Sequence, residues 1–132
     1  NTAATQAQME AAVSTGVYSS PGRQHFHPGH PKAWVNFNSA GTIAASYNIT
    51  SITDTGTGNW TVNIATDFSS GDYVGVITGG YISTPLAIVY NMRSAPAAGT
   101  YAIRANQGGA GGSDQDPDTP NQIHVAFFGD QA

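Results

Sequence analysis

Apolar and polar positions divide the chain into a short helical segment followed by a long series of strands. Residues 1–14 are rich in Ala and Gln and place Met9 and Val13 four positions apart, on one face of a helix. Thr5 and Gln8 have the spacing of a capping box at the start of this helix. A helix this short falls below the ~12–15 residues needed for marginal stability alone, so we expect it to form only by packing against something.

The next stretch, residues 21–34, contains three of the four histidines and three of the seven prolines. Residues 14–16 before it are expected to end the helix, with Gly16 in a left-handed cap. Proline lacks a backbone N–H and restricts the residue that precedes it. We therefore expect residues 21–31 to run extended, as a stiff joint between two kinds of structure.

From residue 32 onward the pattern has the period of two that is typical of strands with one buried face. Trp60, Val62 and Ile64 alternate with polar residues, and the turn-forming residues 54–59 before them give the strongest hairpin prediction in the chain. Residues 73–78 are apolar enough to predict a buried strand. The expected strands cover residues 32–38, 43–53 (one long strand or two joined at a bulge), 60–65, 73–78, 86–90, 100–104 and 122–128.

Turn signals between these short runs predict an all-β fold, a small antiparallel β-sandwich of six to eight strands preceded by a short N-terminal helix. The chain is accordingly divided into a helical segment (1–20), a Pro/His-rich joint (21–31) and a sandwich head (32–132). Residues 107–120 form a long stretch of Gly, Asp and Pro. A structureless loop of that size inside a compact domain is usually functional or disordered.

Composition narrows the class of protein. Charged residues make up 9% of the chain, far below the typical quarter, and such a polar but uncharged surface is typical of extracellular adhesive and virion proteins. The net charge of −4 argues against nucleic-acid binding, and no apolar run approaches the roughly 18 residues of a membrane span. Cysteine is absent, so no disulfide is expected, and we expect oligomerisation to supply part of the stability.

The sequence contains no motif typical of an enzyme. Glu10 is the single Glu, and it falls on the predicted helix. The Ser, His and Asp residues show neither the spacing of a nucleophile elbow nor a paired-acid motif. We therefore predict a protein that binds rather than catalyses.

Four stretches resemble the distal part of tail fibre proteins of tailed phages. Ala4-Thr-Gln-Ala-Gln-Met-Glu-Ala-Ala12, followed by Tyr18-Ser-Ser-Pro-Gly-Arg23, resembles the helix and linker near the fibre end. Lys32-Ala-Trp-Val-Asn-Phe-Asn38 and Ala45-Ser-Tyr-Asn-Ile-Thr-Ser-Ile-Thr-Asp-Thr-Gly-Thr-Gly-Asn-Trp-Thr-Val-Asn63 are similar to the β-domain that follows it. The resemblance covers residues 4–78 and implies an extracellular, homotrimeric fibre tip of a virion that contacts a glycan or protein on the host surface.

The residue pattern agrees with this implication. The apolar face of segment 1–20 is suited to a three-stranded helical bundle on a molecular axis, from which three β-domains would splay. Two other interpretations remain open: a head fibre or capsid decoration protein, which would also be trimeric, and a monomeric carbohydrate-binding module of a secreted enzyme. Because the chain does not begin with Met, we expect it to be part of a longer or processed polypeptide.

His25 and His27 are candidate ligands for a transition metal. In an extended strand, residues two apart point the same way, so both imidazoles would face one side with Phe26 on the other. Three copies around an axis would then supply six nitrogens, an octahedral set. Fibre tips of T-even phages are similar in using Gly-x-His-x-His for an axial metal, but here Arg23 and Gln24 separate the glycine from His25. The alternative is that the two histidines only stack near the joint or contact solvent.

Asp114, Asp116 and Asp118 alternate as in a calcium-binding loop, although the central Gly and the terminal bidentate Glu of an EF-hand are missing. They are interpreted either as a calcium site completed by backbone carbonyls or as a solvated acidic loop. If the domain binds sugar, we expect receptor contacts from Asp114 and Asp116 and from aromatic rings that can stack on a ligand, those of Tyr81, Tyr90 and Tyr101.

Overall fold

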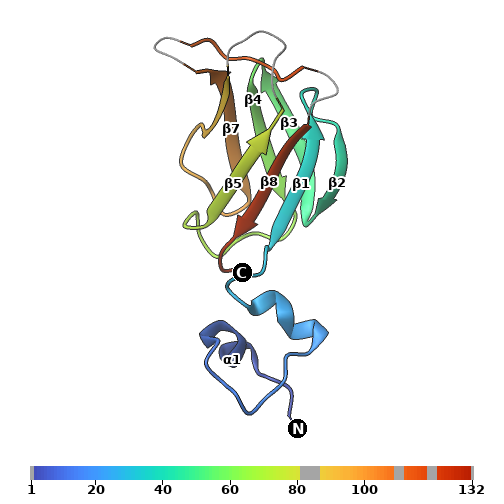
Figure 1. The fold of residues 1–132 in the computed structure, drawn as a ribbon, viewed down its shortest axis with the longest axis vertical. Helices are drawn as coiled ribbons and strands as arrows, with labels where there is room; N and C mark the ends of the chain where they lie inside the picture. The colour runs from blue at the N-terminus through green and yellow to red at the C-terminus, as the bar shows by residue number, and fades with distance from the viewer. Residues whose placement is uncertain (1, 81–86, 109–111, 119–121, 132) are drawn as a thin grey trace.

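The computed structural model describes residues 2–80, 87–108, 112–118 and 122–131 (Figure 1). These residues contain eight strands, one α-helix and one 3₁₀ helix. The helices are α1 (Gln6–Ala11) and η1 (Pro21–Phe26), and the strands are β1 (Ala33–Asn38), β2 (Ile43–Tyr47), β3 (Ile49–Gly56), β4 (Asn59–Ile64), β5 (Val74–Gly79), β6 (Ile88–Met92), β7 (Thr100–Gln107) and β8 (Gln122–Phe128). No helix in this part of the chain is long and apolar enough to cross a membrane.

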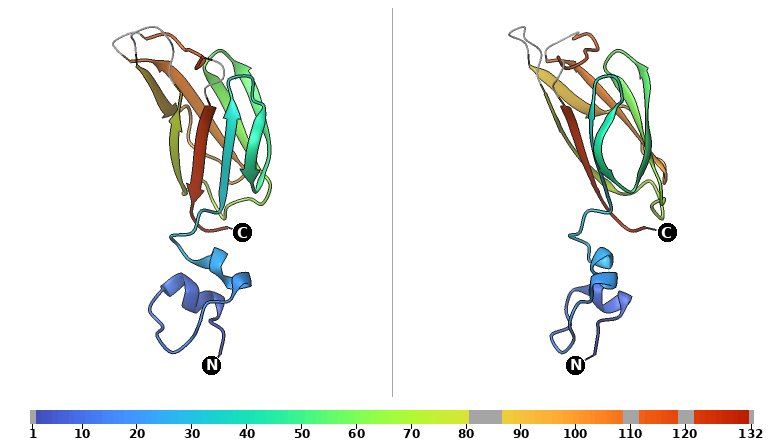
Figure 2. Two further views of the ribbon diagram at one scale, coloured as in Figure 1. Left: turned by 45° about the vertical axis from the view of Figure 1, so that its right-hand side comes forward. Right: turned by 90° about the vertical axis from the view of Figure 1, so that its right-hand side faces the viewer.

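The described strands form two four-stranded antiparallel sheets that pack face to face (Figures 1 and 2). Sheet I has the order β2-β1-β8-β5, and sheet II has the order β3-β4-β7-β6. The predicted all-β sandwich is confirmed, and so is the number of strands. The short N-terminal helix that was expected to precede the sandwich is present as α1.

The chain passes from sheet I to sheet II at Asn48. This crossing shows whether residues 43–53 form one long strand or two, which the sequence left open. Asn48 has a left-handed backbone with φ of 55°. Its side chain donates to the carbonyl of Lys32 at 3.1 Å and accepts from the N–H of Thr66 at 2.8 Å, which fixes the corner. Residues 43–53 are therefore two strands, and these strands lie in different sheets. The hairpin predicted at residues 54–59 is confirmed as the turn between β3 and β4.

The core lies between the sheets and is filled by alternate side chains of both. Trp60 of sheet II packs edge to face on Phe37 of sheet I, with ring centroids 6.0 Å apart. Its indole N–H donates to the carbonyl of Ser39 in the β1–β2 turn at 2.8 Å, so the ring's polar atom is also satisfied. Each large apolar side chain buried in this way contributes about 1.5–3 kcal/mol. The largest fully buried side chains are Trp60, Phe37, Phe68, Phe127, Ile103, Ile123, Val35 and Val62.

Strand β5 turns its glycines inward and its valines outward. A Cβ on Gly75 would lie 2.7 Å from the ring of Tyr101, and one on Gly79 would lie 2.5 Å from the ring of Tyr90. The alternation of β5 places Val74 and Val76 on the outer face, whereas Tyr73 and Ile77 contribute to the core. The prediction of a buried strand at residues 73–78 is therefore wrong for the outward positions only. The two outward valines are 61% and 55% exposed, Val74 and Val76 respectively.

Helix α1 begins as predicted but ends earlier. The capping box is present: the N–H of Gln8 donates to Oγ1 of Thr5 at 3.3 Å, and the N–H of Thr5 donates to Oε1 of Gln8 at 2.9 Å. The left-handed residue at the C-terminus is Ala12, with φ of 52°, and its N–H donates to the carbonyl of Gln8. The predicted cap at Gly16 is therefore wrong, because the helix has already ended.

The Pro/His joint is helical in its first half, so the prediction of an extended stretch is wrong. Pro21 occupies the start of η1, where its fixed φ suits a helix and its missing N–H is not needed. The helix η1 ends at Phe26. The residue that follows, His27, caps it by donating its N–H to the carbonyl of Gln24 at 3.0 Å. Helices α1 and η1 contact one another and lie together at one end of the sandwich, beside the C-terminus (Figures 1 and 2).

Candidate ligand-binding site

The structure separates the two histidines that were predicted to share a metal. His25 lies in η1 with its ring against Phe26, and the two ring centroids are 3.9 Å apart. His27 follows η1, and its Nδ1 accepts a hydrogen bond from the N–H of Gly29 at 3.1 Å. Residues two apart share a face in a strand but not in a helix with three residues per turn. The expectation that both imidazoles face one side, opposite Phe26, is therefore wrong.

The two imidazoles also line different hollows. His25 lies beside Lys32 and Asp130, whereas His27 shares its hollow with His30. Among the described residues of one chain, no group of three or more His, Asp and Glu side chains is placed to hold a metal ion. An axial metal shared between copies of the chain stays a prediction.

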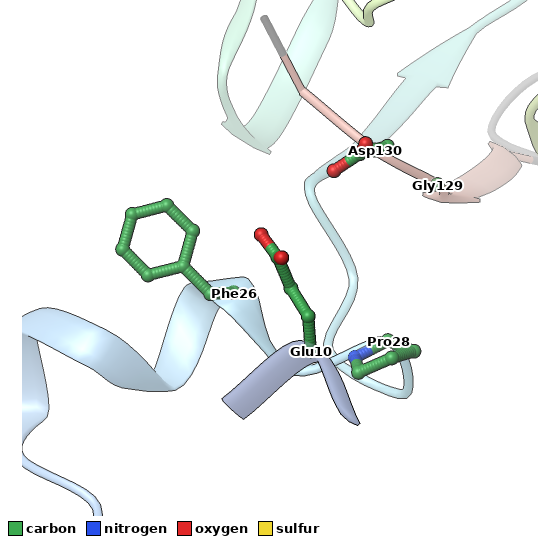
Figure 3. Close-up of a pocket in the computed structure, with 5 residues that line it drawn as sticks. All are labelled: Glu10, Phe26, Pro28, Gly129 and Asp130. Atoms are coloured by element: carbon green, nitrogen blue, oxygen red, sulfur yellow. The ribbon is translucent and has the colours of Figure 1, made fainter. Parts of the chain in front are cut away.

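Lys32 is a buried cation at the joint between the N-terminal segment and the sandwich. Its Nζ donates to the carbonyl of His27 at 3.3 Å. Burial lowers the pKa of Lys32, while the negative charges of Asp130 and Glu10 act in the opposite direction. Figure 3 shows the Glu10 side chain rising from α1 toward the C-terminal segment, in a hollow of about 340 Å³ lined by Glu10, Phe26, Pro28, Gly129 and Asp130. The acids of α1 and of the C-terminal segment therefore lie within electrostatic range of Lys32, and we assign the hollow that they line to this joint.

The acidic residues of the predicted calcium loop are anchored to protein groups. Asp114 accepts from Nε of Arg104 at 2.5 Å and from Nδ2 of Asn59 at 2.8 Å. Asp116 accepts from the backbone N–H of Gly58 at 2.7 Å. The carboxylates of these two residues thus connect residues 112–118 to β7 and to the β3–β4 turn. They do not converge on one position where a calcium ion could lie between them.

Backbone contacts hold residues 112–118 in the same place. The N–H of Gln115 donates to the carbonyl of Ala105 at 3.0 Å, and Asp118 lies half-buried at the end of this segment. Gly58 has φ of +67°, and a Cβ there would lie 2.4 Å from the carbonyl oxygen of Ala105. The described part of the predicted 107–120 loop is therefore an ordered segment that packs closely on a glycine turn.

The tyrosines predicted to contact a ligand have different locations. Tyr81 lies outside the described residues. Tyr101 is buried in the core against Phe127, with ring centroids 5.1 Å apart, so the prediction that its ring offers a stacking face is wrong. Tyr90 is half-buried and donates its hydroxyl to the carbonyl of Gly80 at 3.0 Å. Burial raises the pKa of Tyr90 to about 12.

A polar hollow lies on the outer face of sheet II. It has a volume of about 430 Å³ and is lined by Asn59, Asn91, Met92, Arg93, Arg104 and Asp114. The strand register places Asn59, Arg104 and Asn91 in one row across β4, β7 and β6. Directly opposite residues of antiparallel strands point to the same face, so backbone ladders fix the relative positions of these three side chains.

The charges of this hollow are coupled. The pKa of Asp114 is lowered, first by the hydrogen bond from Asn59, then by the hydrogen bond from Arg104, with further contributions from the positive charges of Arg104 and Arg93. Arg93 is itself oriented by a hydrogen bond from Nη1 to Oγ1 of Thr55 at 3.1 Å. The hollow therefore presents two guanidinium groups, one carboxylate and two amides, a set suited to binding a polar ligand with several oxygen atoms.

Sequence reasoning found one member of this site, Asp114, and missed the others. Asn59, Asn91, Arg93 and Arg104 come from three separate strands and their flanks, and nothing in their spacing indicates that they meet. The signal available in the sequence was the outward position of Arg104 in an alternating strand, since a charged residue there must face solvent.

The outer face of sheet I has the opposite character. The register places Tyr47, Trp34, Ala126 and Val76 in one row across β2, β1, β8 and β5. Trp34 is 39% exposed and Tyr47 is 49% exposed. None of the residues in these four described strands is Asp, Glu, Lys or Arg. Trp34 thus lies on an outer face, whereas Trp60 lies in the core.

Asn36 lies next to this apolar row. It is opposite His124, which is exposed. The Oδ1 atom of Asn36 is buried and has no hydrogen-bond partner among the described residues. A buried acceptor without a donor costs free energy.

Comparisons with protein-family models, with curated proteins and with solved structures find no match for this chain. The function is therefore argued from the chain's own geometry and chemistry.

Proposed function

We propose that this chain is a receptor-binding domain at the distal end of a phage tail fibre, and that it attaches the virion to a host-surface glycan. The observation that carries this proposal is the polar hollow of sheet II, in which amide, guanidinium and carboxylate groups converge beside the side chain of Met92. Support also comes from the resemblance of residues 4–78 to the fibre end and from a surface with few charges.

The hollow suits a sugar for chemical reasons. A sugar ring presents several hydroxyl groups that donate and accept, together with C–H groups that need an apolar contact. Asn59 and Asn91 offer amides, Arg104 offers planar donors, and the exposed Met92 offers apolar surface. Because the polar groups stand on paired strands, little freedom has to be lost when a ligand binds, which favours affinity.

The proposal includes a homotrimer, in which three weak sites on one axis act together through avidity. Val13, beside α1, is 79% exposed, and the apolar row of sheet I is uncovered within the chain. Each copy carries a net charge of −4, so copies would repel one another through most of their surfaces. The uncharged strands of sheet I are the part of the sandwich where copies can approach with the least repulsion.

The test combines a glycan array with sedimentation of the same protein. We expect a trimer that binds a subset of host-surface glycans, with binding lost in Asn59→Ala and Asn91→Ala. The matched control is Asn63→Ala, a residue of the same sheet face that donates to Ser51 and Thr53 outside the hollow.

Three results would contradict the proposal in different ways. A monomer that binds glycans would favour a carbohydrate-binding module. Binding to capsids rather than to host cells would favour a head fibre or decoration protein. A trimer that binds no glycan at all would refute the assignment of the hollow.

A further inference from the structure

We infer that the ligand of the polar hollow carries a carboxylate, as an acidic sugar residue does, and that Arg93 and Arg104 bind it. This inference rests on the proposed function and adds the chemical class of the ligand. It follows from the sign of the local charge, from the donors that remain available, and from the arrangement of the two arginines.

The hollow is locally positive on an acidic chain. The chain has four Lys and Arg residues and a net charge of −4, yet two of those four cations, Arg93 and Arg104, line this hollow with a single carboxylate, Asp114. Two further acids lie at the same end of sheet II, but Asp54 accepts from the N–H of Gly56 at 2.9 Å and Asp116 accepts from a backbone N–H of the same turn. These two acids keep their charge, so the attraction for an anionic group is confined to the lining of the hollow, where two guanidinium groups face one carboxylate.

The single carboxylate of the hollow is already engaged. One oxygen of Asp114 accepts from Nε of Arg104 and the other accepts from Asn59. Its role is therefore to position Arg104, and the groups that remain to meet a ligand are mainly donors. The amide nitrogen of Asn91 also has a protein partner, since it donates to Oδ1 of Asn106 at 3.0 Å.

The two guanidinium groups retain N–H donors for a ligand. A guanidinium has five N–H donors in a planar fork that matches the two oxygens of a carboxylate. Arg104 uses Nε toward Asp114, and Arg93 uses Nη1 toward Thr55. Both groups are exposed, and among the described residues each is held through one nitrogen, so each can bind a carboxylate without losing that contact. Charge-assisted, bidentate hydrogen bonds of this kind are about twice as strong as neutral ones.

The test uses glycans in matched acidic and neutral forms. The probes are tri-galacturonic acid and sialyllactose, each compared with its own methyl ester, measured by calorimetry and on an array with the whole chain. We expect the acidic member of a bound pair to bind at least about tenfold more tightly than the neutral member. Arg93→Gln and Arg104→Gln should each remove most of that difference while leaving the melting temperature nearly unchanged.

Two controls separate charge from geometry. Arg23→Gln removes a cation on η1, where Arg23 lies 6.0 Å from the ring of Phe26, and should leave binding unchanged. Arg104→Lys keeps the charge but loses the planar fork, and should restore only part of the affinity of the wild type.

The outcomes distinguish a failure of this inference from a failure of the proposed function. Equal binding of acidic and neutral members would overturn the inference and leave the proposed glycan binding intact. Binding of phosphorylated or sulfated glycans, competed by inorganic phosphate but not by carboxylates, would also overturn it. If no glycan of any kind binds, both the inference and the proposed function fail.

Discussion

The two outer faces of the sandwich differ sharply, although the two inner faces are alike. Both sheets turn buried aromatic and aliphatic side chains into one core. Outside, sheet I carries an uncharged row with Trp34 and Tyr47, whereas sheet II carries Asn, Thr and Arg side chains around a polar hollow. Both sheets contribute to the same core, so the core does not account for the difference between their outer faces. We therefore interpret that difference as serving a function other than folding.

This difference separates two kinds of contact. Flat, uncharged apolar surface is suited to a partner that covers it permanently, because its burial is favourable and non-directional. A hollow with fixed donors is suited to a ligand that is recognised group by group. We therefore expect substitutions on one face to affect self-association and substitutions on the other to affect ligand binding. The following predictions test that separation.

The largest effect is expected from Gly58→Ala, which disrupts the polar side. Both Gly58→Ala and the matched control Gly41→Ala, at φ of +67° and +75°, place a side chain in the left-handed region, at a cost of about 1–2 kcal/mol. Only Gly58→Ala adds a steric overlap with Ala105 and Gln115, worth roughly a further 1–3 kcal/mol. Chemical denaturation should show this difference, and ligand binding should fall while self-association persists. Equal destabilisation by the two variants would contradict the packing described for residues 112–118.

The next largest effect is expected from Val76→Lys on the apolar face. In the proposed trimer, a charge placed next to Ala126, in the row that contains Trp34, would have to be buried against another copy. The dissociation constant of the trimer should therefore rise at least about 100-fold, or ~2.7 kcal/mol. Because Val76 is more than half exposed within one chain, the monomer should keep its melting temperature. Analytical ultracentrifugation measures the effect, and Thr53→Lys on the exposed face of sheet II is the control. Loss of association in both variants would refute the assignment of separate faces.

A smaller loss of stability is expected from Tyr90→Phe, which removes a contact between the two sheets. The Tyr90 hydroxyl joins β6 of sheet II to the carbonyl that follows β5 of sheet I, and its loss should cost about 1 kcal/mol. Burial raises the pKa of Tyr90 to about 12, so the fold favours the neutral phenol.

The sign of the pH dependence follows from that shift. Stability from Tyr90 is fully present below the ordinary tyrosine pKa of about 10 and is lost as the pH rises through 12. Thermal melts between these values should fall less steeply in Tyr90→Phe than in the wild type. Tyr47→Phe, at an exposed position, controls for the substitution itself. An unchanged slope in Tyr90→Phe would contradict the burial of the Tyr90 hydroxyl.

The smallest effect concerns Asp114, whose pKa is lowered by Asn59 and then by Arg104. Its ion pair is fully formed above the ordinary Asp pKa of about 3.9 and should be lost only as the pH falls below that value. A carbon NMR titration of the Asp114 side chain measures this directly. Asn59→Ala should raise the midpoint, with little change in stability because the pair is partly exposed. An unchanged midpoint in that variant would contradict the coupling.

The sequence predicts the fold well because the strands alternate. The period of two at Trp60, Val62 and Ile64, and the turn before them, correctly indicate the β3–β4 hairpin. The Pro/His joint is mispredicted because proline was treated as a helix breaker, whereas Pro21 begins a short helix. Local pattern identifies a strand, but proline has to be interpreted by its position within an element.

The candidate site could be predicted only in small part. Asp114 is conspicuous in an acidic run, but its partners Asn59 and Arg104 are brought to it by strand pairing between distant segments. No local spacing encodes that register. The exposed valines were also missed, since Val and Ile in a strand suggest burial until the partner side chains are known.

The glycines of β5 also determine how that strand is aligned. A shift of one residue would exchange every inward and outward side chain, and would bury Val74 or Val76 where Gly75 now leaves room for the ring of Tyr101. The shifted arrangement would gain apolar burial on the strand but lose the space for the tyrosines. The tyrosine rings of sheet II therefore determine the register of β5 in sheet I. The same register keeps Val74 and Val76 exposed, where a partner could contact them.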